Sequence, residues 1–218
     1  MPHRTRIKFC GITRVEDAML AAEIGADAIG MLLHADSRRR ISRERAGQIL
    51  SVLPPFVTPV GLFVDAPLPL VLEVVNELGL RHVQLHGQES PEFVAQLPGR
   101  VVVKAIHISR GAIDQALAPW RNVPQLKGVL LETGGSAQPG GTGIENDWPA
   151  IREYQQRGGF DRLPPLIAAG GLRPDTVAEV IRTLRPFAVD VSSGIESEPG
   201  IKSKQKMTDF IAAVRSAD

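Results

Sequence analysis

Eight short apolar runs, separated by longer stretches with helical spacing, constrain the fold of this 218-residue chain more than any other feature. Most of the runs are continuously apolar rather than alternating, which is typical of parallel strands whose sheet is covered by helices. Eight strand–helix units favour a closed (β/α)8 barrel, because an open doubly wound sheet usually has about five or six strands. The expected strands cover residues 7–10, 28–32, 57–63, 82–85, 101–106, 128–132, 165–168 and 188–191.

Local signals predict where several helices begin and end. Thr13 and Glu16 have the spacing of a capping box, so Thr13 is the expected N-cap of the first helix. Pro174 fits the first turn of a helix that carries Leu184 on its apolar face. Further helix ends are marked by serines that suit an N-cap and glycines that suit a left-handed C-cap, namely Ser42, Ser90, Ser203, Gly25 and Gly79.

Composition matters mainly for the function classes that it argues against. The chain has 25 Lys and Arg against 24 Asp and Glu, so its net charge of +1 predicts no nucleic-acid partner. Its apolar runs are strand-sized and residues 1–6 lack the apolar segment of a signal peptide, so we expect no membrane association and a cytoplasmic location. The single cysteine, Cys10, argues against a disulfide or a cysteine-cluster zinc site. No linker interrupts the pattern, so residues 1–218 are expected to form one domain.

The carboxyl ends of the strands are where a (β/α)8 barrel carries its chemistry. Cys10 ends the first run and Glu132 ends the sixth. A thiol at the barrel mouth serves as a base or nucleophile once its pKa falls, and a carboxyl group opposite it serves as a general acid. The plainer alternatives are a small buried apolar residue for Cys10 and a salt-bridged strand end for Glu132.

Two kinds of anion site are also predicted. An arginine-rich loop, residues 38–45, follows the second run, and a guanidinium group from it could bind a substrate carboxylate through paired hydrogen bonds. Most of these arginines are expected to be solvated. Glycine and serine turns follow the seventh and eighth runs, where many (β/α)8 enzymes bind phosphate on backbone N–H groups. These turns contain Gly170, Gly171, Ser192, Ser193 and Gly194.

Other polar residues near the strand ends allow more than one interpretation. His86 is either a hydrogen-bonded structural histidine or part of the site, and Asp190 is a further active-site candidate. Lys104 could form a Schiff base, although a lysine in that place is more often paired inside the barrel. The glycine-rich residues 134–143 have the length and composition of a lid or ligand cradle.

Seven motifs in the same order and spacing resemble the phosphoribosylanthranilate isomerase family. They are KFCGIT at 8–13, GADAIG at 25–30, VGLFV at 60–64, VQLHG at 83–87, GGTG at 140–143, AGGL at 169–172 and DVSSG at 190–194. The resemblance implies a (β/α)8 aldose–ketose isomerase, an intramolecular oxidoreductase of tryptophan biosynthesis that uses no cofactor and no metal. Its substrate is a small phosphorylated molecule, N-(5-phosphoribosyl)anthranilate, and a monomer is the default expectation.

The resemblance also implies a role for individual residues. Cys10 corresponds to the family's general base, and Arg39 to the arginine that contacts the anthranilate carboxylate. The phosphate would rest on the backbone near Gly170, Gly171 and Ser192 to Gly194. Glu132 stands where the family has its acidic aspartate, and it is one methylene longer.

Other departures from the family pattern affect the substrate site more than the fold. Residues 31–34 lack aromatic side chains, Arg38 replaces a usual proline, and residues 144–146 differ from the common sequence. Two alternatives follow. One is the related histidine-pathway isomerase that acts on the aminoaldose phosphate ProFAR, although that enzyme has acidic residues where Cys10 and His107 stand here. The other is a phosphate-binding relative without catalysis.

Overall fold

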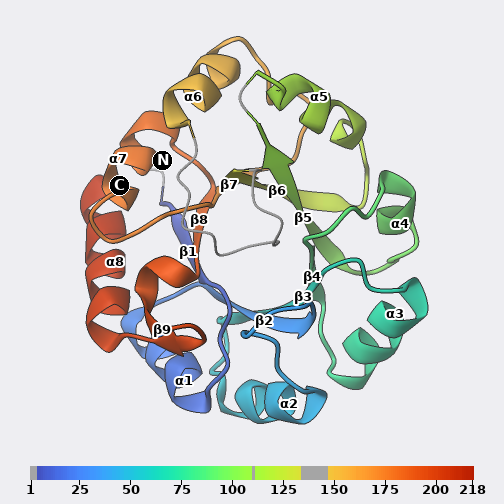
Figure 1. Ribbon diagram of the computed structural model, residues 1–218, viewed down its shortest axis with the longest axis vertical. Coiled ribbons are helices and arrows are strands. Elements are labelled where there is room, and N and C mark those ends of the chain that lie inside the picture. Colours follow the sequence, from blue (N-terminus) through green and yellow to red (C-terminus); the bar gives the residue numbers. More distant parts are fainter. Residues whose placement is uncertain (1–3, 110, 134–146) are drawn as a thin grey trace.

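Eight parallel strands close into a barrel in the order β1 to β8 (Figure 1). The computed structural model describes residues 4–109, 111–133 and 147–218. The strands are β1 Arg6–Phe9, β2 Ala28–His34, β3 Thr58–Phe63, β4 His82–Leu85, β5 Val101–Ile108, β6 Leu126–Thr133, β7 Leu166–Ala168 and β8 Ala188–Val191. The predicted (β/α)8 barrel is confirmed.

The helices form a ring around this barrel, as Figure 1 shows. They are α1 Val15–Ile24, α2 Arg43–Val52, α3 Leu68–Glu77, α4 Pro91–Ala95, α5 Ile113–Leu117, α6 Trp148–Gln156, α7 Val177–Leu184 and α8 Lys204–Ala217, with 3-10 turns at Ala118–Trp120 and Ser193–Ile195. Within the residues that the structure describes, no helix is long and apolar enough to cross a membrane.

The predicted strand positions are confirmed to within a few residues at each end. β1 ends at Phe9, so Cys10 is the first residue after the strand rather than its last. β6 extends to Thr133, which places Glu132 within the strand. β2 and β5 each continue two residues further than expected, to His34 and Ile108.

Helix capping shows where local signals were overridden. The prediction that Thr13 caps α1 is wrong, because the N-cap is Arg14 and the Thr13 hydroxyl donates to the Gly200 carbonyl instead. Ser42 and Ser203 cap α2 and α8 as predicted, through hydrogen bonds from Arg45 N and Lys206 N.

The remaining helix ends follow the predictions in part. Ser90 occupies the N-cap position of α4 without making a side-chain cap bond. Gly25 is the left-handed C-cap of α1, with φ of 93°, and Gly79 follows the end of α3 at φ of 62°. Pro174 lies in the turn before α7 rather than in its first turn, because the helix begins only at Val177.

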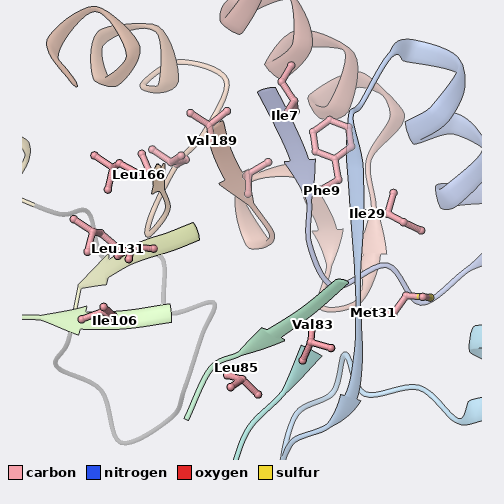
Figure 2. Packing of buried hydrophobic residues seen from close by; sticks show 14 of the residues in the cluster. Ile7, Phe9, Ile29, Met31, Val83, Leu85, Ile106, Leu131, Leu166 and Val189 are labelled. Carbon is pink, nitrogen blue, oxygen red and sulfur yellow. The ribbon is translucent and has the colours of Figure 1, made fainter. Parts of the chain in front are cut away.

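Successive side chains of each strand alternate between two cores. Ile7 and Phe9 face the helices, where the Phe9 ring meets Phe210 of α8 edge to face at 6.0 Å between centroids. Figure 2 shows labelled residues of this outer layer on seven of the strands. Lys8 and Cys10 alternate with Ile7 and Phe9 and therefore point into the barrel. The inner apolar clusters consist of Ala105, Leu130, Ile167, Ala169 and Ala188, and of Cys10, Val60 and Leu62.

A hairpin between the barrel and the last helix was not predicted. Its strands are β9 (Glu196–Glu198) and β10 (Ile201–Lys202), which pair antiparallel directly after β8. Strands of three and two residues are too short to produce a recognisable periodic pattern. The hairpin places Glu196 and Lys202 beside the mouth of the barrel.

The contact between β1 and α8 provides a stability prediction. Phe210 is fully buried, so Phe210→Ala should lower the free energy of unfolding by about 3–5 kcal/mol through lost burial and a new cavity. Met19→Ala, at a side chain that is 54% exposed, is the control and should cost under about 0.5 kcal/mol. Urea unfolding of both variants measures the difference, and equal losses would contradict the packing described here.

Candidate active site

An open cavity lies at the carboxyl ends of the strands, with a volume of about 700 Å³ that includes space open to solvent. The cavity brings together residues from β2, β3, β6 and β8 and from the segments directly after β1, β2, β3, β4, β7 and β8. All the predicted site residues line it: Cys10, Arg39, His86, Glu132, Gly170, Gly171, Asp190, Ser192, Ser193 and Gly194.

Cys10 lies on one wall of this cavity, 6% exposed. Lys8, two residues earlier and on the same face of the chain, donates from Nζ to Asp190 Oδ1 at 2.7 Å. β1 and β8 are paired in the register Lys8 to Asp190, which explains this contact. Burial raises the pKa of the Cys10 thiol, and the positive charge of Lys8 acts against that rise.

Glu132 lies on another wall, on β6, and is 7% exposed. Its Oε2 is 2.7 Å from His86 Nε2, and His86 Nδ1 is 3.0 Å from Gln84 Nε2. The Gln84 amide nitrogen is a donor, so Nδ1 accepts and Nε2 carries the proton that His86 donates to Glu132. The chain Gln84–His86–Glu132 therefore fixes the orientation of the carboxyl group. His86 is hydrogen-bonded and also part of the cavity wall.

Arg39 reaches the cavity from the loop after β2, whereas its neighbours Arg38 and Arg40 are exposed. Its Nε and Nη2 donate to the two oxygens of Glu196 at 2.8 and 2.7 Å. These bonds use two of the five N–H donors of a guanidinium group. They fix the orientation of the guanidinium group at the cavity and leave its other N–H donors for a ligand such as a carboxylate.

Lys202 completes a charged cluster behind Arg39. Its side chain is fully buried, and its Nζ donates to Glu196 Oε1 at 2.9 Å and to the Ser192 carbonyl at 3.1 Å. Burial raises the pKa of Glu196, but the hydrogen bonds from Arg39 and the charge of Lys202 outweigh this and leave the pKa below its usual value. Burial also lowers the pKa of Lys202, against the attraction of Glu196. The cluster joins the loop after β2 to the turn after β8.

The turns after β7 and β8 depend on glycine. Gly170 and Gly171 have φ values of 87° and 66°, which residues with a side chain rarely adopt. A Cβ atom on Gly194 would lie 1.9 Å from the Leu172 carbonyl oxygen, so the two turns pack backbone against backbone. This close packing leaves a surface of main-chain atoms at the cavity, which is the kind of surface that binds phosphate.

Lys104 belongs to a separate buried pair. Its Nζ is 3.1 Å from Glu89 Oε2 and donates to the Gly87 carbonyl at 2.6 Å. Burial lowers the pKa of Lys104, against the attraction of Glu89. The expectation that Lys104 is paired is therefore correct, but the pair lies on the outer face of the barrel, because Val102 and Ile106, two positions away on either side, pack in the outer core. The Schiff-base alternative is not supported.

Comparison with known proteins now identifies the family. The model of the N-(5'phosphoribosyl)anthranilate (PRA) isomerase family matches residues 7–213. The chain belongs to this family. Curated relatives named N-(5'-phosphoribosyl)anthranilate isomerase include one from Nitrosococcus oceani, 41% identical over 99% of this chain and 100% of its own, and one from Pseudomonas fluorescens, 44% identical over 96% and 98%.

Solved structures of phosphoribosylanthranilate isomerases have the same fold. The Thermotoga maritima enzyme aligns with a TM-score of 0.86 and 37% identity, covering 97% of this chain and 99% of its own. Another structure of the family, with a TM-score of 0.83 and 37% identity over the same shares of the chains, contains reduced 1-(o-carboxyphenylamino)-1-deoxyribulose 5-phosphate.

Several residues of this isomerase site were not predicted. Lys8 and Glu196 contact Asp190 and Arg39, which are 182 and 157 positions away in the chain. Gln84 and Lys202 contact the nearer residues His86 and Ser192. The one available signal was alternation along β1, which places Lys8 on the same face as Cys10.

The predicted lid at 134–143 and the atypical residues 144–146 lie outside the described residues. Within the described ranges, no group of three or more His, Cys, Asp or Glu side chains is placed to hold a metal ion.

Proposed function

We propose that this chain is a phosphoribosylanthranilate isomerase of tryptophan biosynthesis. It rearranges N-(5-phosphoribosyl)anthranilate to 1-(2-carboxyphenylamino)-1-deoxy-D-ribulose 5-phosphate. The observation that carries the proposal is one cavity lined by a thiol, a carboxyl group, an arginine and two glycine-rich turns. The names of the relatives, and the carboxyphenylamino-deoxyribulose phosphate bound to a family member, support the same substrate class.

The reaction needs an acid and a base on different sides of the substrate. Glu132 protonates the ring oxygen of the ribose, which opens the ring and leaves a Schiff base between C1 and the anthranilate nitrogen. Cys10, as a thiolate, then takes the proton from C2 and forms an enolamine, which tautomerises to the ketose product. Cys10 follows β1 and Glu132 lies on β6, so the two groups act from separate parts of the cavity wall.

The two ends of the substrate are anions, and the cavity has a group suited to each. Arg39 binds the anthranilate carboxylate while Glu196 holds its guanidinium plane. The main chain at Gly170, Gly171 and Ser192 to Gly194 binds the phosphate. A cytoplasmic location is part of this proposal, because a single reduced cysteine that acts as a base suits a reducing compartment.

Removal of the base is the first test. Cys10→Ala should lower kcat by at least about 10²-fold, the lower range for a positioned acid–base group, with the fold retained. Turnover of freshly prepared N-(5-phosphoribosyl)anthranilate, followed as the loss of anthranilate-type fluorescence, measures the rate, and thermal unfolding controls for the fold. Absence of turnover in the unmodified protein would favour the alternative of a phosphate-binding relative without catalysis. Near-normal turnover in Cys10→Ala would mean that Cys10 is a buried packing residue and not the base.

Shortening the acid tests whether the site is adapted to glutamate. Glu132→Asp shortens the side chain by one carbon–carbon bond, about 1.5 Å. The carboxyl group is thereby withdrawn from His86 Nε2, which lies 2.7 Å from Glu132 Oε2. We expect kcat to fall by up to about 10²-fold with little change in KM, because the lost contact belongs to the transition state. Glu132→Gln should be at least as slow. A faster Glu132→Asp variant would mean that the pocket still suits aspartate, and full activity of Glu132→Gln would exclude Glu132 as the acid.

Removal of the carboxylate-binding group should separate the two anion sites. Arg39→Ala should weaken binding of ligands with the anthranilate carboxylate by about 1.5–3 kcal/mol, the usual contribution of a charge-assisted hydrogen bond. Inhibition by inorganic phosphate should hardly change, since that anion binds other loops. Arg38→Ala, at an exposed neighbour, is the matched control and should affect neither ligand. Equal losses for both ligands in Arg39→Ala would show that Arg39 acts through the fold or the general electrostatic field.

A further inference from the structure

Lys8 is a buried cation with no role in the reaction steps described above. It is 7% exposed, and its ammonium group is anchored by Asp190 at 2.7 Å. Cys10, the first residue after β1, points to the same side of the chain, and the charge of Lys8 favours its thiolate. A buried lysine with one carboxylate partner would satisfy its charge without the thiol. The ammonium group nevertheless lies near the sulfur atom.

Gly30 on β2 makes room for this contact. A Cβ atom at Gly30 would lie 3.0 Å from Lys8 Nζ and 3.1 Å from Cys10 Sγ. The ammonium group and the sulfur atom therefore both lie against the bare backbone of the neighbouring strand. Leu62 Cδ1 is equally close, at 3.0 Å, so an alanine here would press on the ammonium group, the sulfur atom and Leu62 together.

The other charged groups around the thiol are already paired with each other. Lys202 of β10 and Arg39 of the loop after β2 both attract a thiolate, and both are bonded to Glu196. Asp190 of β8 repels a thiolate and is bonded to Lys8. Among these groups Lys8 is the one whose charge opposes the effect of burial most strongly.

We propose that Lys8 is a positioning residue that favours ionisation of Cys10 to the thiolate, against the effect of burial, and that Gly30 is the space that allows it. Lys8 donates a hydrogen bond to Sγ and keeps its own protons, so the proton from C2 goes to sulfur alone. The carboxylate of Asp190 fixes the ammonium group in place. The catalytic role of the thiolate rests on the proposed function, but ionisation of Cys10 is measurable without any substrate.

The experiment titrates the thiol directly. Cys10 is the single cysteine of the chain, so the rate of alkylation by iodoacetamide as a function of pH reports its ionisation without interference. In Lys8→Met the thiol pKa should rise by at least one unit, which lowers the thiolate fraction at a fixed pH below that pKa by about tenfold. Lys8→Arg keeps the charge and should fall between the two. The pH profile of kcat/KM should move in the same direction.

A second pair of variants keeps every charged group. Gly30→Ala forces the Lys8 ammonium and the Cys10 sulfur apart and should raise the thiol pKa, even if Lys8→Met fails to fold. Gly61→Ala is the matched control, because a Cβ atom there meets Leu33 Cδ1 and Leu80 Cδ1 at 3.0 Å each and no ionisable group. Crowding is similar at the two glycines, so a shift confined to Gly30→Ala reports the contact itself.

The outcomes separate this proposal from the proposed function. A raised thiol pKa in Gly30→Ala and in any folded Lys8→Met, with Gly61→Ala unchanged, supports the role of Lys8. An unchanged thiol pKa in Gly30→Ala or Lys8→Met overturns it, whatever happens to turnover, and leaves Lys8 as a structural ion pair. Absence of turnover in the unmodified protein would overturn the proposed function alone, since the titration of Cys10 needs no substrate.

Discussion

Closure of eight parallel strands into a barrel is the constraint on which the rest of this structure depends. Closure removes every free strand edge, and strand alternation then sends every second side chain into a space without bulk water. An ionisable group in that space must find a partner, because an isolated buried charge is very unfavourable. Lys8 with Asp190 is such a pair. Lys104 with Glu89 meets the same requirement in the layer between the strands and the helices. The rest of the barrel interior is filled by small apolar clusters, which reach the cavity at Cys10 and Ala169.

Paired charges near the mouth do more than satisfy this requirement. A buried ion pair contributes little net stability, since the cost of desolvation offsets much of the attraction. Arg39, Glu196 and Lys202 nevertheless form a continuous cluster from the loop after β2 to the turn after β8. The hairpin that carries Glu196 and Lys202 thus ties together the two loops that are proposed to bind opposite ends of the substrate. The cluster therefore fixes the distance between these two loops more than it stabilises the fold.

The limits of prediction from the sequence follow from this same closure. Cys10 and Glu132 could be identified because each lies at the end of an apolar run, and the barrel rule converts that position into a place at the mouth. The pairs could not, because Lys8 and Asp190 are 182 residues apart and meet only through the register of β1 and β8. Thr13 illustrates the opposite error. Thr13 and Glu16 have the spacing of a capping box, but the Thr13 hydroxyl group donates a hydrogen bond to the Gly200 carbonyl in the hairpin instead.

The two walls of the cavity have different charged neighbours. Lys8, Lys202 and Arg39 lie around Cys10 and favour its thiolate, against burial and the charge of Asp190. Imidazoles lie beside Glu132. His107 is next to it in the register of β5 and β6, and burial lowers the pKa of His107, so this imidazole is neutral near pH 7. The longer side chain of Glu132 fits this arrangement, because it reaches His86 across β5, whereas an aspartate on β6 would end about 1.5 Å short of that contact.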